Sequence, residues 1–139
     1  MREWSGRNPI RLVIDRFLRL SDKLSLFDRK QKTICFNLLK HEEHPNFSLV
    51  RLDEQDFIDS MLDYLVKEKI QSVMIEGGSL TLGLFIEAGL WDEARVFTSP
   101  RLFHTGISAP RLGGDLITEE KISTDMLRLY RPKTLKANH

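Results

Sequence analysis

The stretch SVMIEGGS, residues 72–79, decides the fold class of this chain. Its first half, Ser72 to Ile75, is a short and mostly apolar run, which is typical of a buried strand in a parallel sheet. The two glycines that follow mark a tight turn. An apolar segment from about Ser79 to Ala88 then predicts a helix, with Gly89 as its C-terminal stop. The stretch therefore predicts a strand, a turn and a helix in immediate succession.

The same alternation extends to both sides of this stretch. A further helix is expected because apolar residues recur on one helical face between Phe57 and Val66, with Asp53 as the N-cap. Polar loops are expected at residues 41–46 and 100–115. Strands are expected at residues 10–14, 32–37, 47–52, 93–98 and 123–130. Alternating strands and helices indicate βαβ crossovers. The sequence thus predicts an α/β fold, with a mainly parallel sheet and flanking helices.

Composition narrows the class of protein. The chain has 139 residues, 41% of them hydrophobic, which suits one soluble domain. Its 21 basic and 20 acidic residues nearly cancel, which disfavours nucleic-acid and membrane partners. The single cysteine, Cys35, excludes an internal disulfide and indicates a buried thiol in a cytoplasmic protein. Residues 132–139 are expected to form a disordered tail.

The Gly-Gly turn is the strongest candidate site. It follows a predicted strand and opens a predicted helix, where free backbone N–H groups and the helix dipole attract anions. Glycine lets a phosphate approach the backbone closely. Glu76 would then accept a hydrogen bond from an amino or hydroxyl group of a ligand. A tight turn with a solvated Glu76 is the alternative, because the stretch matches neither a Walker loop nor a GxGxxG fingerprint.

Other polar residues give weaker signals. Asp15 and Arg16 end a predicted strand, where they form either part of a ligand site or a surface pair. The segment His41–His44 has two histidines three residues apart, followed by Pro45, which favours a solvated loop over a metal site. His104 is expected in a surface loop. No metal site is predicted.

Four segments together resemble the reductase domain of riboflavin biosynthesis. NPIRLVIDR at residues 8–16 is similar to that family's PxRxVxD segment, and SVMIEGGS at residues 72–79 is similar to its EGG turn. IEAGLWDE at residues 86–93 is similar to xEAGLVDE, and SPRL at residues 99–102 is similar to APKL. The segments occur in the family's order and cover nearly the whole chain.

The resemblance implies a dihydrofolate-reductase-like fold and a specific reduction reaction. Such enzymes use NADPH to reduce the ribosyl group of 5-amino-6-(5-phosphoribosylamino)uracil to a ribityl chain, and they commonly form homodimers. Carried over by position, Glu76 and Arg2 would bind the substrate, with Arg2 on its phosphate. The residues carried over to the cofactor site are Asp15, Arg16, Gly77, Gly78, Ser79, Leu80 and Thr81.

The resemblance also implies that part of the domain is missing. The family's SLDGK and GxxTxxxDDP segments are absent, and so is the signature of a zinc deaminase. Residues 1–139 are therefore expected to be the C-terminal portion of a reductase domain that is incomplete at its N-terminus. The alternatives are a catalytically inactive fragment and a dimerising nucleotide-binding module.

Overall fold

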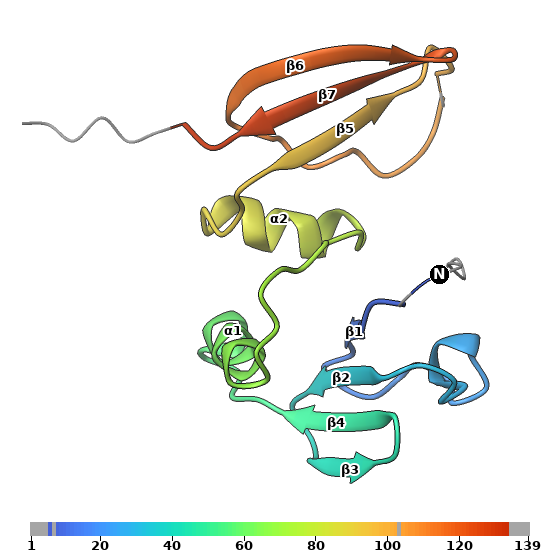
Figure 1. The fold of residues 1–139 in the computed structure, drawn as a ribbon, viewed down its shortest axis with the longest axis vertical. Coiled ribbons are helices and arrows are strands. Elements are labelled where there is room, and N and C mark those ends of the chain that lie inside the picture. Colours follow the sequence, from blue (N-terminus) through green and yellow to red (C-terminus); the bar gives the residue numbers. More distant parts are fainter. Residues whose placement is uncertain (1–5, 7, 103, 134–139) are drawn as a thin grey trace, which may run out of the picture. The chain divides into compact units, whose positions relative to one another are not determined.

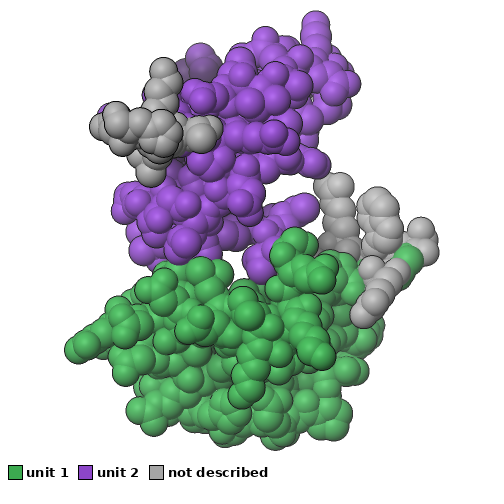
Figure 2. All heavy atoms as spheres, turned by 60° about the vertical axis from the view of Figure 1, so that its left-hand side comes forward, with its two compact units in different colours: residues 1–72 green, residues 73–139 purple. Residues whose placement is uncertain are grey.

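The structure, a computed structural model, describes residues 6, 8–102 and 104–133. The chain divides into two compact units, unit 1 at residues 1–72 and unit 2 at residues 73–139 (Figure 2). Each unit is described by itself. That residues 1–139 form one partial domain stays a prediction.

Unit 1 contains a four-stranded sheet in the order β1-β2-β4-β3 (Figure 1). Its strands are β1 (Arg11–Ile14), β2 (Thr33–Asn37), β3 (Glu42–His44) and β4 (Phe47–Arg51). The first, second and fourth are parallel, as predicted, and lie within one residue of the expected bounds. β3 corrects the prediction of a loop at residues 41–46, because Asn46, with φ of 58°, turns the chain back into an antiparallel hairpin with β4.

The core of unit 1 is centred on β2. All five residues of this strand are buried, as expected for an interior strand of a parallel sheet. Helix α1 (Phe57–Lys67) buries Phe57, Met61 and Leu65, which are spaced four residues apart on one face. The rings of Phe36 and Tyr64 meet edge to face at 5.7 Å between centroids. The sheet and the helix therefore share one core.

The start of α1 differs from the prediction. Its N-cap is Asp56 rather than Asp53. The Asp53 carboxylate instead accepts the N–H of Gln55 at 2.9 Å, in the turn that precedes the helix. Aspartate favours such local bonds in turns as well as at caps, so the residue type alone did not distinguish the two positions.

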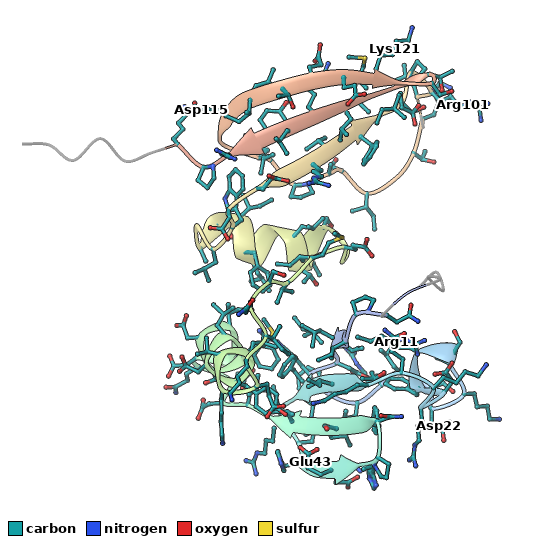
Figure 3. The ribbon with its side chains drawn as sticks, viewed as in Figure 1. Arg11, Asp22, Glu43, Arg101, Asp115 and Lys121 are labelled. Atoms are coloured by element: carbon teal, nitrogen blue, oxygen red, sulfur yellow. The ribbon has the colours of Figure 1, made fainter. Side chains whose placement is uncertain are left out.

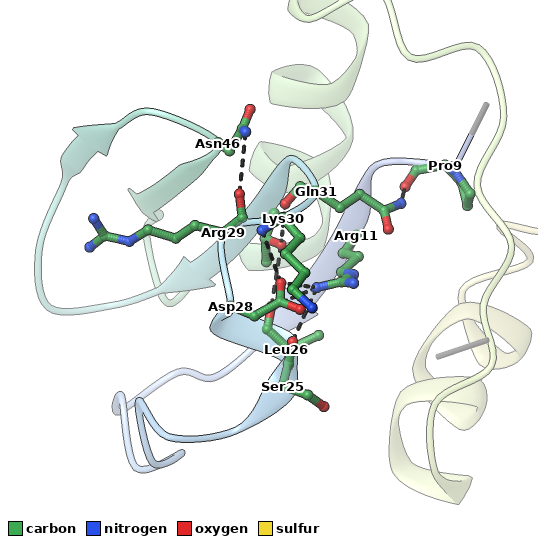
Figure 4. A network of polar contacts seen from close by, with 10 residues as sticks. Pro9, Arg11, Ser25, Leu26, Asp28, Arg29, Lys30, Gln31 and Asn46 are labelled. Atoms are coloured by element: carbon green, nitrogen blue, oxygen red, sulfur yellow. Dashed lines mark hydrogen bonds and ion pairs between the residues drawn. The ribbon is translucent and has the colours of Figure 1, made fainter. Parts of the chain in front are cut away.

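A buried arginine fixes the long connection between β1 and β2 (Figure 4). This connection contains a 3₁₀ helix, η1 (Ser25–Phe27). The Arg11 guanidinium donates to the carbonyls of Ser25 and Leu26 at 3.2 and 3.3 Å, and its Nη1 lies 2.9 Å from the Asp28 carboxylate. The backbone N–H of Lys30, and then Arg11, hold the pKa of Asp28 below its ordinary value. These Arg11 contacts hold the connection against the start of β1.

Unit 2 contains a helix and an antiparallel sheet in the order β5-β7-β6 (Figure 1). Its elements are α2 (Ser79–Glu87), β5 (Ala94–Thr98), β6 (Asp115–Ile122) and β7 (Asp125–Arg131). α2, β5 and β7 were predicted. β6 was not assigned, and the expectation of parallel pairing is wrong here. A short turn with Ser123 at φ 57° joins β6 to β7, and such a hairpin needs no crossover helix.

The predicted strand at residues 72–75 is also wrong. These residues have no regular structure, and Val73 and Met74 are exposed. A run of this kind forms a strand only beside a neighbouring strand, and no described strand pairs with it. In the described part of the chain, no helix is both long and apolar enough to cross a membrane.

Candidate functional site

The Gly-Gly turn opens α2 as the sequence predicted. Gly78 is the N-cap residue, with φ −62° and ψ 174°, and α2 begins at Ser79. No side chain caps the helix start, so its first-turn N–H groups have no side-chain acceptor. Glu76, Gly77 and Gly78 are exposed. The geometry is that of an open, uncapped helix start with a carboxylate two residues before the cap.

The two glycines have different surroundings. A Cβ at Gly77 would lie 2.9 Å from the Cβ of Thr81, so the packing of the turn requires glycine at this position. A Cβ at Gly78 would meet nothing within 4 Å, and its φ suits any residue. Gly78 therefore leaves space above the helix start that internal packing does not use.

The helix itself is apolar on all sides. Phe85 is its one buried residue, whereas Leu80 is 86% exposed and Leu84 is half exposed. A helix of this composition is usually buried on more than one face. Leu80, expected at the cofactor, thus lies on an open surface beside the turn.

Asp15 and Arg16 have partners inside unit 1. The Asp15 carboxylate is buried and accepts the N–H groups of Arg19 and Leu20 at 3.0 and 2.8 Å. The Arg16 guanidinium lies 4.7 Å from the centre of the Phe57 ring. Both residues therefore shape the carboxyl end of β1. Asp15 and Arg16 belong to unit 1, whereas the Gly-Gly turn belongs to unit 2, so their joint role at one cofactor stays a prediction. Arg2 lies outside the described residues.

The histidine-rich segment places charged and titratable side chains beside one another at β3. Glu42 lies 2.8 Å from Lys40 and 3.4 Å from His44, and these hydrogen bonds, the one from Lys40 first, lower the pKa of Glu42. His41 lies 3.6 Å from Glu43. Within residues 8–102 and 104–133, no three His, Cys, Asp or Glu side chains are grouped so that they could hold a metal ion.

A cavity of about 420 Å³ lies in unit 1, and the sequence did not predict it. Its walls come from segments far apart in the chain, so no local motif could have revealed it. They include Leu18, Phe27, Cys35, His44 and Phe47. Burial raises the pKa of the Cys35 thiol to about 11, so this thiol stays protonated near neutral pH.

Comparison with solved structures shows the fold. A bifunctional deaminase/5-amino-6-(5-phosphoribosylamino)uracil reductase from Thermotoga maritima is 25% identical, with a TM-score of 0.76, and the match covers 92% of this chain and 39% of that one. RibD from Acinetobacter baumannii, in its second form, is 18% identical, with a TM-score of 0.74 over 95% of this chain and 42% of that one. The riboflavin biosynthesis reductase of Saccharomyces cerevisiae is 16% identical, with a TM-score of 0.68 over 88% of this chain and 69% of that one.

These likenesses confirm the α/β, dihydrofolate-reductase-like fold class that the sequence predicted. The chain spans about two fifths of the two bacterial proteins, with 39% and 42% of their lengths covered. A sequence model of the RibD C-terminal domain matches residues 1–128. That match covers most of the 139 residues, so this chain belongs to the RibD C-terminal domain family.

Proposed function

We propose that this chain is part of an NADPH-dependent reductase that converts 5-amino-6-(5-phosphoribosylamino)uracil to its ribityl form in the cytoplasm. Membership of the RibD C-terminal domain family supports the reaction class. The similar Thermotoga maritima protein is described as a deaminase and reductase for this pyrimidine. The single observation that carries the proposal is the uncapped, exposed turn at Glu76–Ser79.

In this proposal the helix start holds the cofactor phosphates. The backbone N–H groups of Ser79, Leu80 and Thr81 donate to phosphate oxygens, and the helix dipole strengthens these bonds. Gly78 permits close approach, because no neighbouring atom fills the space beside it. NADPH, when bound, supplies the hydride that reduces C1 of the opened sugar.

In this proposal, charged groups also hold the substrate. Glu76 accepts a hydrogen bond from the substrate, and an exposed carboxylate is suited to an amino or hydroxyl donor. Arg2 binds the substrate phosphate, and Asp15 and Arg16 lie at the cofactor. These three assignments follow the family pattern by position.

Titration of the purified chain with NADPH, followed by nicotinamide fluorescence, tests the proposal. We expect saturable binding that Gly78→Ala weakens by at least about tenfold, since a methyl group there would stand between the backbone and a phosphate. Gly83→Ala is the matched control, because a Cβ at Gly83 also meets nothing within 4 Å but lies inside α2. If Gly78→Ala and Gly83→Ala bind NADPH with equal affinity, the turn is not part of the cofactor site.

A second candidate is a binding module without turnover. It is favoured by one observation: the chain spans only 39% of the Thermotoga maritima protein. Assay of NADPH oxidation with the pyrimidine substrate separates the two candidates. Binding with turnover supports a reductase, whereas binding without turnover supports the module or an inactive fragment. If the chain binds no NADPH at millimolar concentration, the cofactor site is not formed by this chain alone.

A further inference from the structure

The cavity of unit 1 lies on the face of the sheet opposite α1. Side chains alternate between the two faces along a strand, and Phe36 meets Tyr64 of α1. Its neighbour Cys35 therefore faces away from the helix. Leu49 lies beside Cys35 in the next strand and shares that face, and so does Phe47, two residues before it. Cys35, Leu49 and Phe47 form the apolar floor of the cavity.

The connection between β1 and β2 forms the facing wall, and contacts within the chain hold it in place. The ring of Phe27 packs edge to face on Phe47, at 5.6 Å between centroids. The Asn46 amide donates to the carbonyl of Arg29 at 3.2 Å (Figure 4). Leu18 and Arg29 both line the cavity with φ of 50° and 57°, which side-chain-bearing residues adopt only where their surroundings fix them. The wall is thus pre-formed, as is typical of small-ligand sites.

The charged groups on the walls are not all paired with one another. Lys40 and Glu42 form an ion pair at 2.8 Å. The Arg29 guanidinium instead lies over the Phe47 ring, 6.0 Å from its centre, and no described carboxylate forms an ion pair with it. Asp22 also has no bonded partner among the described residues. Within that part of the chain, the cavity presents an unpaired cation and an unpaired anion beside an apolar floor.

The residues expected at the cofactor do not supply these groups. Asp15 lies on the cavity wall, but its two carboxylate oxygens accept the N–H groups of Arg19 and Leu20 at 3.0 and 2.8 Å. The Arg16 guanidinium lies against the Phe57 ring of α1, and α1 covers the other face of the sheet. A ligand in the cavity would therefore depend on Arg29 and Asp22 rather than on these two residues.

We propose that this cavity binds a small aromatic anion that also carries an O–H or N–H donor. The ring of the ligand packs on the floor at Phe47 and Leu49, where apolar and aromatic side chains favour a planar group. Its anionic group binds the Arg29 guanidinium, and its donor binds the Asp22 carboxylate. The volume of about 420 Å³ falls within the range of ~300–1,000 Å³ that is usual for such sites. This binding is additional to the proposed reductase function and does not rest on it.

Titration of the full chain with para-hydroxybenzoate, followed by the NMR signals of leucine methyl groups, tests the site. This probe has a ring, a carboxylate and a hydroxyl donor. We expect saturable shifts of Leu18, Leu20 and Leu49, which line the cavity, at about millimolar concentration, the range for a ligand of this size. Leu80 and Leu84 are exposed on α2 and report non-specific binding to apolar surface, so their signals should not move.

Variants and related probes separate the two charged contacts. Arg29→Gln should weaken binding of para-hydroxybenzoate at least about tenfold, because it removes a charge-assisted hydrogen bond. Arg19→Gln is the matched control, since the Arg19 guanidinium also lies over a phenylalanine ring of the same connection, at 5.4 Å, but does not line the cavity. Phenol lacks the carboxylate and benzoate lacks the hydroxyl group, so each should bind more weakly. Asp22→Ala should abolish the preference for para-hydroxybenzoate over benzoate.

Several outcomes would overturn the proposal. Wild type without saturable shifts would do so, as would equal affinity of Arg29→Gln and Arg19→Gln. Shifts of Leu84 as large as those of Leu49 would assign the binding to exposed apolar surface instead. If Arg29→Gln does not fold, the probes decide on wild type, because phenol that binds as tightly as para-hydroxybenzoate leaves no role for the guanidinium. None of these readouts depends on NADPH binding.

Discussion

The two units of this chain differ in how much of their surface they bury. In unit 1, β2 is buried along its whole length and α1 contributes three buried residues. In unit 2, Phe85 is the one buried residue within the described part, and every residue of β6 is exposed. Asp115 and Lys121 are labelled near the two ends of β6 in Figure 3. A sheet becomes stable when a second layer covers one of its faces. Unit 1 therefore has a core of its own, whereas unit 2 presents apolar side chains that a core would bury.

This difference bears on function. The candidate ligand turn belongs to unit 2, the unit with the smaller core. A ligand that binds only the folded state stabilises that state by mass action. Bound NADPH should therefore raise the stability of unit 2 more than that of unit 1.

The sharpest test compares one aromatic residue from each unit. Phe36→Ala removes a fully buried ring and should lower the free energy of unfolding by about 3–5 kcal/mol. Phe97→Ala removes a ring that is 61% exposed and should cost roughly 0.5 kcal/mol or less. Urea denaturation of both variants measures the two values. A cost for Phe97→Ala close to that of Phe36→Ala would show that unit 2 has a core after all.

Glu76→Gln tests whether unit 2 is built for a ligand. In a complete reductase that contains this domain, we expect a KM raised or a kcat lowered by one to two orders of magnitude. That is the scale of losing a charge-assisted hydrogen bond, ~1.5–3 kcal/mol. Glu87→Gln, an exposed residue at the other end of α2, is the matched control. An unchanged kcat/KM for Glu76→Gln would remove Glu76 from the substrate site.

The Gly-Gly turn allows a comparison within unit 2. Gly77→Ala should destabilise the start of α2 by roughly 1–2 kcal/mol, because the new methyl group would press on Thr81. Gly78→Ala should leave stability nearly unchanged, since it has open space around it. Amide exchange along α2 in the absence of cofactor measures both effects. Equal protection in the two variants would mean that Thr81 moves aside without cost.

The smallest effect concerns the thiol in the core of unit 1. Burial disfavours the thiolate and so raises the pKa of the Cys35 thiol to about 11, above its ordinary value. A raised folded pKa contributes stability that is complete below about pH 9 and is lost as the pH rises toward 11. About 1 kcal/mol should be lost by roughly pH 10. Cys35→Ala should flatten this part of the pH profile, and an identical profile for both proteins would contradict the assignment.

Much of the fold could be predicted from local pattern. The apolar runs at β1, β2 and β4, and the i, i+4, i+8 spacing of α1, predicted these elements and the α/β class. The turn at Glu76–Ser79 and the helix after it were predicted from two glycines and an apolar segment. These signals are local, because they depend on side-chain periodicity and on the conformational freedom of glycine.

The failures share one cause, which is that a strand forms only beside a partner strand, and a segment's own composition does not reveal that partner. β3 consists of Glu42, Glu43 and His44, and every residue of β6 is exposed, so only the strand beside each of them reveals that it is a strand. Residues 72–75 have the composition of a buried strand but no strand beside them. The direction of pairing in unit 2 depends on a hairpin turn near Ser123 rather than on the alternation of elements.

Motifs and periodicity in consecutive residues were enough to predict the family, most of the helices and strands, and the turn that opens α2. Folding brings together the contacts that bury residues and place the Asp15 and Arg11 hydrogen bonds inside unit 1. It also sets Gly77 against Thr81 and leaves the space beside Gly78 open. Contacts of this kind depend on distances between side chains that the chain brings together only when it folds. That is why residue type predicted a role for both glycines, and packing alone distinguished them.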